Sequence, residues 1–456
     1  MNYIFFLYVF FWIITHTTSF LPKISGFYGL VGPNIDKKKV NTLYELFIGD
    51  GVIQGVFFDK GKITFIKHVI NTEKIQYEKK HGKFSKNNIM MFFYMMLHEM
   101  KIMPNPLGLA NTALLDIHDG GMRTTSEPGP GPGPGPRNIL SLFERDQPYK
   151  IQVDFKNKQL NTICKINTQQ IKHFSGHSKY DVRTNTLHTI DYNVLCNDIS
   201  YFQTDNTFHN IIEKAKLKTE YVPIIHDFFV LHDAILYIDS PIVWNFLKET
   251  PVFLYNKKPT YIKIYNMTTQ KTTQYTCKEN GFYIFHYGDV IDTPETIEIY
   301  GPLYESLDFT SLNIDGKYRK ILVNKKTGQV SIHKNPLLEN MNLDFPVKWN
   351  EYVLLRNLYG NERAIKGLVV CKGIEIVKQM NLPENRFLCG EPAIVEHEGI
   401  PIVVGFVYDR EDNGYFIMFD MFNLQDSYVE VPVPIKNMTI GFHSVVLSDS
   451  DFGKIL

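Results

Sequence analysis

Short runs of β-branched and aromatic residues recur along most of this 456-residue chain. They are bounded by residues that favour turns, and they follow one another at about ten-residue spacing. This pattern is typical of a β-sandwich, barrel or propeller, and not of alternating strands and helices. We therefore expect an all-β fold, although no repeat of fixed length is found. Examples of these runs are residues 51–59, 62–70, 150–155, 260–266, 321–333, 401–409 and 414–421.

The charge balance excludes a nucleic-acid-binding protein. The chain carries 48 Lys+Arg and 48 Asp+Glu, whereas neutralising phosphates takes a surplus of cations on one face. Aromatic residues make up 14% of the chain, and the mean hydropathy is −0.16, which excludes general disorder and a polytopic membrane protein. The length allows about three domains, but a large closed β fold forms a single unit equally well.

The N-terminal residues 1–19 form a separate segment. Residues Ile4–Ile14 are an unbroken apolar run, which is shorter than the roughly 20 residues that span a bilayer. The length fits a signal peptide or a short membrane anchor, although no basic residue precedes the run. A first core strand is the alternative. We take residues 20–456 as a single folded domain, and the sequons at Asn266 and Asn437 are compatible with secretion.

Three other segments depart from the strand pattern. Residues 128–136 alternate Pro and Gly, which removes backbone donors and disfavours a helix, so we expect an exposed insertion loop. Helices are expected at residues 88–100 and 210–216. The first contains a Met-rich apolar stretch, either a buried helix or an exposed patch for membrane contact and substrate entrance. The residues of that patch are Met90, Met91, Phe92, Phe93, Met95 and Met96.

Four of the 15 histidines lie within or directly after apolar, strand-like runs. A propeller or barrel projects such positions toward its axis. Neutral imidazoles that meet there would bind a divalent first-row metal such as iron or zinc, although their spacing alone defines no motif. These histidines are His177, His226, His286 and His443.

Three carboxylates lie in similarly apolar surroundings, at Glu144, Asp344 and Glu391. Burial of an unpaired carboxylate is costly, so each requires a partner if it is buried. A metal-bound histidine commonly donates its second ring nitrogen to such a group. Exposed turn positions are the alternative for all three.

Taken together and in order, these motifs resemble the carotenoid cleavage oxygenase family from about residue 21 to about residue 447. The most specific short match is His226-Asp-Phe, which corresponds to the family's HDF. Each motif alone is weak, and their joint order carries the resemblance. In chain order the matching segments are 21–34, 47–56, 111–114 (NTAL), 139–149, 175–181, 226–228, His286, 390–392 (GEP) and 441–443 (GFH).

The resemblance implies a seven-bladed β-propeller with a helical or loop cap over its top face, where the substrate tunnel lies. It also implies an iron(II) on the propeller axis. The metal ligands would be His177, His226, His286 and His443, and the outer partners of three of them would be Glu144, Asp344 and Glu391.

Two positions modify this implied site. The family usually has Glu where this chain has Asp344, and one methylene less shortens the reach by about 1.5 Å. An inward shift of the strand, a bridging water or a less firmly oriented His286 would each accommodate the difference. Thr112, from its place in NTAL, is expected to crowd an open position of the iron.

The implied activity is cleavage of a conjugated double bond of a carotenoid or apocarotenoid with dioxygen, which yields aldehyde or ketone products. Stilbene cleavage and retinoid isomerisation are alternatives on the same fold. A secreted propeller without catalysis, acting as a binding module, is an alternative of another class, but it would not need four histidines. We expect a monomer or weak dimer that contacts a membrane peripherally, in the secretory pathway or endoplasmic reticulum.

Overall fold

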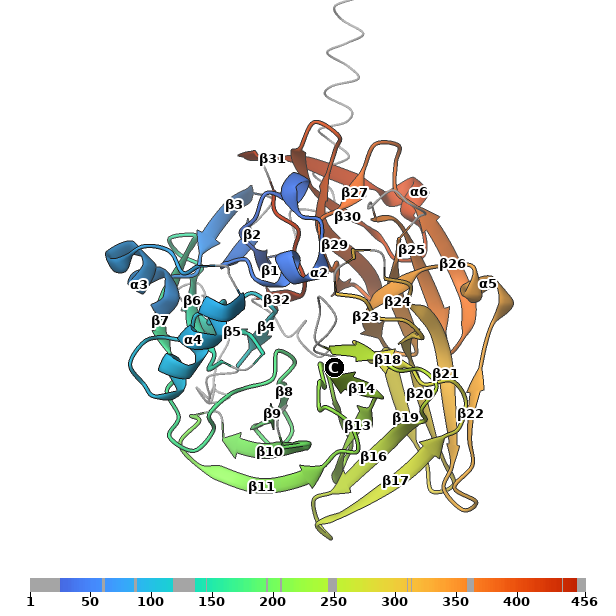
Figure 1. Cartoon of the computed structure of the whole chain (residues 1–456). Helices are drawn as coiled ribbons and strands as arrows, with labels where there is room; N and C mark the ends of the chain where they lie inside the picture. The colour runs from blue at the N-terminus through green and yellow to red at the C-terminus, as the bar shows by residue number, and fades with distance from the viewer. Residues whose placement is uncertain are drawn as a thin grey trace, which may run out of the picture.

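The strands form seven sheets of four or five strands around a central axis, and each sheet is one blade of a β-propeller (Figure 1). The computed structural model describes residues 25–59, 62–85, 88–117, 136–144, 146–193, 196–205, 207–244, 252–309, 311–312, 314–358, 365–436 and 438–448. The prediction of an all-β, seven-bladed propeller is confirmed for these residues. The expected segment 1–19, residues 128–135 of the Pro-Gly tract and Asn437 lie outside them.

In each of the first three blades, four strands follow one another from the axis outward. Blade 1 contains β32 (Ser444–Ser448), β1 (Gly26–Pro33), β2 (Gly51–Asp59) and β3 (Lys62–Val69). Blade 2 contains β4 (Ala113–Asp116), β5 (Arg137–Leu142), β6 (Tyr149–Asp154) and β7 (Gln159–Lys165). Blade 3 contains β8 (Lys179–Asp181), β9 (Thr186–Asn193), β10 (Asp198–Asp205) and β11 (Ile211–Lys218).

Blades 4 and 5 carry additional short strands. Blade 4 contains β12 (Phe229–Val230), β13 (Ala234–Asp239), β16 (Thr260–Asn266) and β17 (Lys271–Cys277), and β14 (Ile242–Trp244) pairs with β15 (Val252–Leu254) in a separate hairpin. Blade 5 contains β18 (Tyr283–Ile284), β20 (Thr296–Tyr304), β21 (Lys317–Asn324) and β22 (Val330–His333), and β19 (Asp289–Asp292) also pairs with β20.

Blades 6 and 7 complete the ring. Blade 6 contains β23 (Leu343–Trp349), β24 (Tyr352–Leu358), β25 (Ile365–Lys372) and β26 (Glu375–Asn381). Blade 7 contains β27 (Phe387–Leu388), β29 (Ile400–Tyr408), β30 (Asn413–Asp420) and β31 (Val429–Lys436), and β28 (Ala393–His397) also pairs with β29.

In blade 4, burial is highest in the second strand from the axis and lowest in the outermost strand. All six residues of β13 are buried, whereas β17, the outermost strand of the same blade, is mostly exposed. A strand such as β13 is covered on both faces by neighbouring blades, which explains its nearly continuous apolar sequence. Strands such as β6 alternate buried and half-buried residues, as expected for a strand with one face on the core.

The ring is closed by pairing between the two ends of the described chain. The last strand, β32, runs antiparallel to β1, from Leu30 opposite Ser444 to Gly26 opposite Ser448. Blade 1 therefore contains strands from both ends of the sequence (Figure 1). Pairing of this kind covers the edge of β1 and ties the first blade to the last described strand of the chain.

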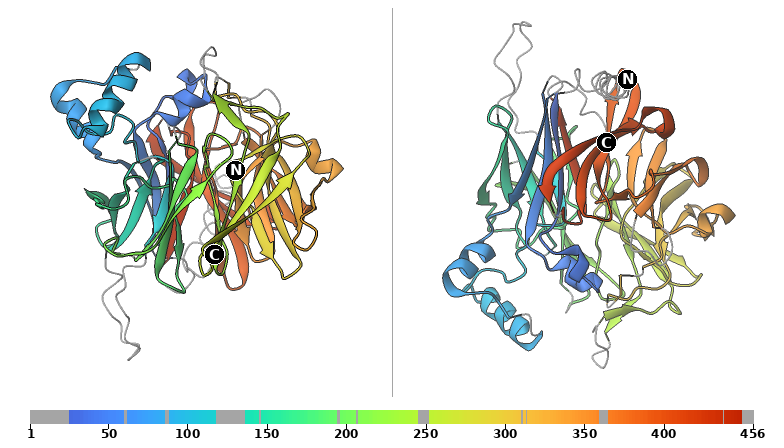
Figure 2. Two further views of the ribbon diagram at one scale, coloured as in Figure 1. Left: turned by 60° about the horizontal axis from the view of Figure 1, so that its bottom comes forward. Right: turned by 90° about the horizontal axis from the view of Figure 1, so that it is seen from above.

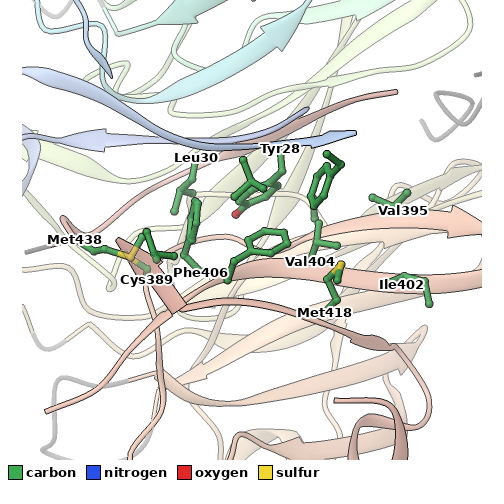
Figure 3. Close-up of a cluster of buried hydrophobic side chains, with 14 residues drawn as sticks. Tyr28, Leu30, Cys389, Val395, Ile402, Val404, Phe406, Met418 and Met438 are labelled. Atoms are coloured by element: carbon green, nitrogen blue, oxygen red, sulfur yellow. The ribbon is translucent and has the colours of Figure 1, made fainter. Parts of the chain in front are cut away.

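Neighbouring blades are held together by apolar side chains between their sheets. Figure 3 shows one such cluster between blades 1 and 7, where Tyr28 and Leu30 of β1 meet Phe406 of β29. The rings of Tyr28 and Phe406 lie 5.4 Å apart, within the range of favourable aromatic pairs.

The helices of the described part of the chain are short and lie outside the sheets. They are the 3-10 helix η2 (Lys37–Lys39) and the α-helices α2 (Leu43–Phe47), α3 (Glu73–His81), α4 (Asn88–Glu99), α5 (Pro336–Glu339) and α6 (Leu424–Ser427). Helices α2, α3 and α4 lie at the same end of the propeller (Figure 2). A cap that covers the whole of this face stays a prediction. Among the described helices, none is both long enough and apolar enough to cross a membrane.

One of the two predicted helices is confirmed. The segment at 88–100 forms α4. The prediction of a helix at 210–216 is wrong, because residues 211–218 form strand β11. Its helix-forming residues Glu213, Lys214 and Ala215 pair instead with β10, so sheet pairing overrides the local propensity.

Helix α4 presents apolar side chains to solvent. Met90, Phe93 and Met96 are 38%, 50% and 49% exposed, and Met95 is half-buried. Spacings of three residues place the three exposed side chains on one helix face. These exposures favour the surface-patch alternative for this segment over a buried core helix.

The closing contact gives a prediction. A Cβ at Gly32 of β1 would lie 2.3 Å from the carbonyl oxygen of Ile440, whereas a Cβ at Gly405 of β29 meets only ordinary contacts at 3.5 Å. Gly32→Ala is therefore expected to lower the free energy of unfolding by about 1–3 kcal/mol, a typical cost of overpacking. Gly405→Ala is the matched control and is expected to be near neutral. Equal urea midpoints for the two variants would contradict this account of the closure.

Candidate metal centre

Four histidines come together at the inner ends of four blades. His177 precedes β8 in blade 3, and His226 precedes β12 in blade 4. His286 lies between β18 and β19 in blade 5, and His443 directly precedes β32 in blade 1. Each histidine lies next to a strand near the propeller axis. The convergence of the blades on this axis therefore brings together residues up to 266 positions apart.

The imidazoles are close enough to share one ion. One ring nitrogen from each lies within 4.8 Å of the corresponding nitrogen of all the others. The Nε2 atoms of His177 and His226 are 3.0 Å apart. His286 Nε2 is buried without a hydrogen-bond partner among the described residues. A buried polar nitrogen normally has a partner, and here a metal ion would provide it.

The opposite ring nitrogens of three histidines face carboxylates. His226 Nδ1 contacts Glu144 Oε1. His286 Nδ1 lies 2.8 Å from Asp344 Oδ1, and His443 Nδ1 lies 3.0 Å from Glu391 Oε1. These contacts place the Nδ1 proton toward the acid and leave Nε2 as the lone-pair donor.

Backbone and side-chain donors hold the carboxylates in turn. Tyr192 donates its hydroxyl hydrogen to Glu144 at 2.7 Å, and the Ser444 amide donates to Glu391 at 2.9 Å. The Phe345 amide donates to Asp344 at 2.7 Å. The Asp344 contact is direct, so the shorter side chain is accommodated without a bridging water.

Electrostatics keep two of the outer acids, Asp344 and Glu391, ionised. Burial alone would raise the pKa of the Asp344 carboxyl, but the charge and hydrogen bond of His286 lower that pKa to about 2. Burial likewise opposes ionisation of Glu391, and its pKa is nevertheless lowered, chiefly by His443. Both groups are therefore carboxylates at neutral pH.

The pKa values of the imidazoles differ according to their partners. Burial, reinforced by the other three histidines, lowers the pKa of His177 well below its usual value. Burial also lowers the pKa of His443. For His226 burial acts in the same direction, but Glu144 raises the pKa above its usual value. His177 and His443 are therefore neutral at pH 7, as metal coordination requires.

Thr112 lies beside this cluster. It directly precedes β4, is buried and lines the cavity that opens onto the histidines. A Cβ at Gly176 would lie 2.8 Å from its methyl carbon, so only glycine lets Thr112 approach the chain next to His177 so closely.

This cavity has a volume of about 550 Å³. The volume lies in the usual range for small-molecule sites. Helix α2 contributes Leu43, Leu46 and Phe47 to its wall. No described residue of α4 lines it, so a role of the Met-rich patch at the substrate entrance stays a prediction. Further apolar lining residues are Phe143, Ile224, Phe285, Phe309, Leu312, Phe345, Leu358, Ile440 and Phe442.

Sequence reasoning missed several residues of the site. Tyr192 and Ser444 support the outer carboxylates, and Phe345 and Arg356 line the cavity. Ser444 and Phe345 directly follow predicted residues in sequence, which was an available signal. Nothing in the local sequence marks Tyr192 or Arg356.

The donor set fits a first-row divalent metal. Imidazole nitrogens bind such ions at about 2.0–2.1 Å, which places ligands up to about 4.2 Å apart. The observed spacing, within 4.8 Å, requires only a small contraction.

Comparison with known proteins identifies a family that covers most of the chain. The profile of the family described as "Retinal pigment epithelial membrane protein" matches residues 22–445. The chain belongs to this family, the carotenoid cleavage oxygenases. The resemblance seen in the sequence is thereby confirmed.

Individual relatives are distant. A carotenoid 9,10(9′,10′)-cleavage dioxygenase 1 of Arabidopsis thaliana is 28% identical over 245 residues, which are 49% of this chain and 40% of that protein. The enzyme of the same name from Pisum sativum is 24% identical over 77% of this chain and 66% of its own length. The chain thus spans less than two thirds of either relative. A cobalt-substituted apocarotenoid oxygenase of Synechocystis has the same fold, with a TM-score of 0.73, 14% identity and 94% coverage of both chains.

The cluster gives a second prediction. His226→Ala removes one nitrogen donor and leaves Glu144 without its imidazole partner, so metal affinity is expected to fall more than tenfold. His232→Ala is the control, because that side chain is 81% exposed and lies outside the cluster. Metal content per chain is measured by mass spectrometry after dialysis. Undiminished metal in His226→Ala would show that this histidine is not a ligand.

Proposed function

We propose that the protein is a non-haem iron(II) dioxygenase that cleaves a conjugated double bond of a carotenoid or apocarotenoid. The observation that carries the proposal is the four-histidine cluster with three outer carboxylates at the end of an apolar cavity. Four imidazoles without a carboxylate ligand suit iron(II), zinc and related ions. Membership of the family favours iron.

Iron in this site would supply the reaction with dioxygen, in which one C=C bond is divided into two carbonyl groups that each take one oxygen atom. The residues of this chain hold and orient the site. His177, His226, His286 and His443 are the proposed ligands.

The outer acids set the direction of the rings. Glu144, Asp344 and Glu391 each accept from an Nδ1 atom and so keep Nε2 available. We assign no acid to His177, whose main-chain amide donates to Ser175 Oγ at 3.0 Å. Its position depends on the tight packing of Gly176 against Thr112.

The cavity wall selects the substrate by shape. Aromatic and aliphatic side chains offer a polyene dispersion and π contacts and exclude water from the cleaved bond. Thr112 occupies space beside His177, and we assign to it a restriction on which groups reach the metal.

Peripheral membrane contact is part of the proposal. The exposed face of α4 with Met90, Phe93 and Met96 offers an apolar surface at the end of the propeller where α2 lines the cavity. A lipophilic polyene is dissolved in membranes, so contact there would shorten its transfer.

The proposal is tested with protein purified anaerobically and assayed for iron. The iron-loaded protein is then incubated under air with β-carotene and with an apocarotenal, and aldehyde products are identified by mass spectrometry. We expect cleavage that stops after removal of the metal by a chelator and returns with added iron(II). Iron-loaded protein that leaves every polyene intact would contradict the proposed activity.

A further inference from the structure

Most polar side chains in the cavity wall already have partners. Asn111 donates to the carbonyl oxygens of Phe47 and Gly49 at 2.9 and 2.7 Å. Asn342 donates to a backbone carbonyl at 2.6 Å. These amides are occupied by the fold and are not available to a ligand.

The lysines at the cavity wall are also paired. Lys37 and Lys38 lie 2.7 and 2.5 Å from the carboxylate of Asp412. Both ammonium groups therefore already have a bonded partner, although they share a single carboxylate. Arg410, a third cation of the wall, is exposed to solvent.

Arg356 is different. It lies on β24 and lines the cavity, yet only 7% of the residue is exposed. Its Nε is buried without a hydrogen-bond partner, and no described residue forms an ion pair with its guanidinium. Burial lowers the pKa of Arg356 to about 10, so it is still charged at neutral pH.

The guanidinium is held by stacking instead of by hydrogen bonds. Its central carbon lies over the ring of Phe345, 3.4 Å from the ring centre. Stacking on an aromatic face uses the π surface of the guanidinium and leaves its in-plane N–H donors free.

The nearest carboxylates are already engaged. Asp344 lies opposite Arg356 in the pairing of β23 with β24, but its oxygen accepts from His286. Glu391 accepts from His443 and Ser444. Both attract Arg356 electrostatically without bonding it.

A buried cation without a bonded partner is costly. A ligand oxygen in the cavity would satisfy it, and an arginine fork is well suited to a carbonyl or carboxylate. We infer that Arg356 is a specificity-determining residue that anchors an oxygenated polyene by its carbonyl or carboxylate oxygen, in preference to a hydrocarbon carotene. This inference rests on the proposed function and narrows its substrate class to apocarotenoids.

The geometry also limits where that oxygen lies. The ring of Phe345 is 4.8 Å from the rings of both His286 and His443. Only one phenyl ring and one imidazole therefore separate Arg356 from the centre of the cluster. The oxygenated group would lie near the metal, a short distance along the chain from the bond that is cleaved.

A purely electrostatic role is the rival explanation. In that case Arg356 would only balance the charge of Asp344 and Glu391, and its removal would change the affinity for all ligands by the same factor. A comparison of ligands that differ only in the oxygen function separates the two roles.

The test measures binding to the iron-loaded full chain without dioxygen, so that no cleavage occurs. The probes are an apocarotenoic acid, the aldehyde of the same length, and the hydrocarbon in which a methyl group replaces the oxygen function. Dissociation constants are taken from quenching of protein fluorescence. We expect the wild-type protein to prefer the oxygenated probes by about ten- to hundredfold, as for one charge-assisted hydrogen bond.

Arg356→Met keeps the length of the side chain and removes the charge and donors. It is expected to abolish this preference, and Arg356→Lys to retain part of it. Arg319→Met is the matched control, because Arg319 is also buried but is paired with Glu305 and Glu339. The control is expected to keep the wild-type preference.

Two results would overturn the inference. One is equal affinity of the wild-type protein for acid, aldehyde and hydrocarbon, a measurement that needs no variant to fold. The other is an iron-loaded Arg356→Met variant whose affinity for all three probes falls by the same factor. Failure of the protein to cleave polyenes under air would instead count against the proposed dioxygenase activity, because the binding preference is measured without that reaction.

Discussion

The pairing of β1 with β32 is the contact on which the rest of the site depends. His443 directly precedes β32, and its carbonyl accepts from the Val31 amide at 3.1 Å. The Phe442 amide donates back to Val31 at 2.7 Å, and the Glu391 amide donates to Phe442 at 3.1 Å. The contact that closes the ring therefore also positions one histidine and its carboxylate. A propeller that fails to close would lose the fourth imidazole even if the other blades fold.

The buried charges of the site are interdependent. Three carboxylates accept hydrogen bonds from the imidazoles. Arg356 lies close to two of these carboxylates. With a divalent ion in place, the three negative charges would be balanced by the metal and the guanidinium together. Neutral His177 and ionised Asp344 follow from this arrangement, because burial disfavours charge on groups that have no partner.

The sequence allowed the blades and the four converging histidines to be predicted, but not the contacts between strands. Strand runs such as residues 321–333 contain their own signals, and the histidine motifs occur in a recognisable order. In contrast, Glu213, Lys214 and Ala215 favour a helix locally, yet they lie in β11 and pair with β10. Arg356 could not be found either, since its proximity to Asp344 arises only from the register of β23 and β24.

Phe345 links the metal centre to the proposed recognition of substrate. Its φ of 56° lies in the left-handed region, which costs about 1–3 kcal/mol for a non-glycine residue and persists only where its surroundings require it. Regular pairing of β23 is interrupted between Asp344 and Val347, at the point where Asp344 must reach His286 with a short side chain. The same backbone conformation places the Phe345 ring between the imidazoles and the guanidinium of Arg356. The strained backbone therefore allows two contacts at once. A regular strand here would displace either the Asp344 carboxylate from His286 or the Phe345 ring from Arg356.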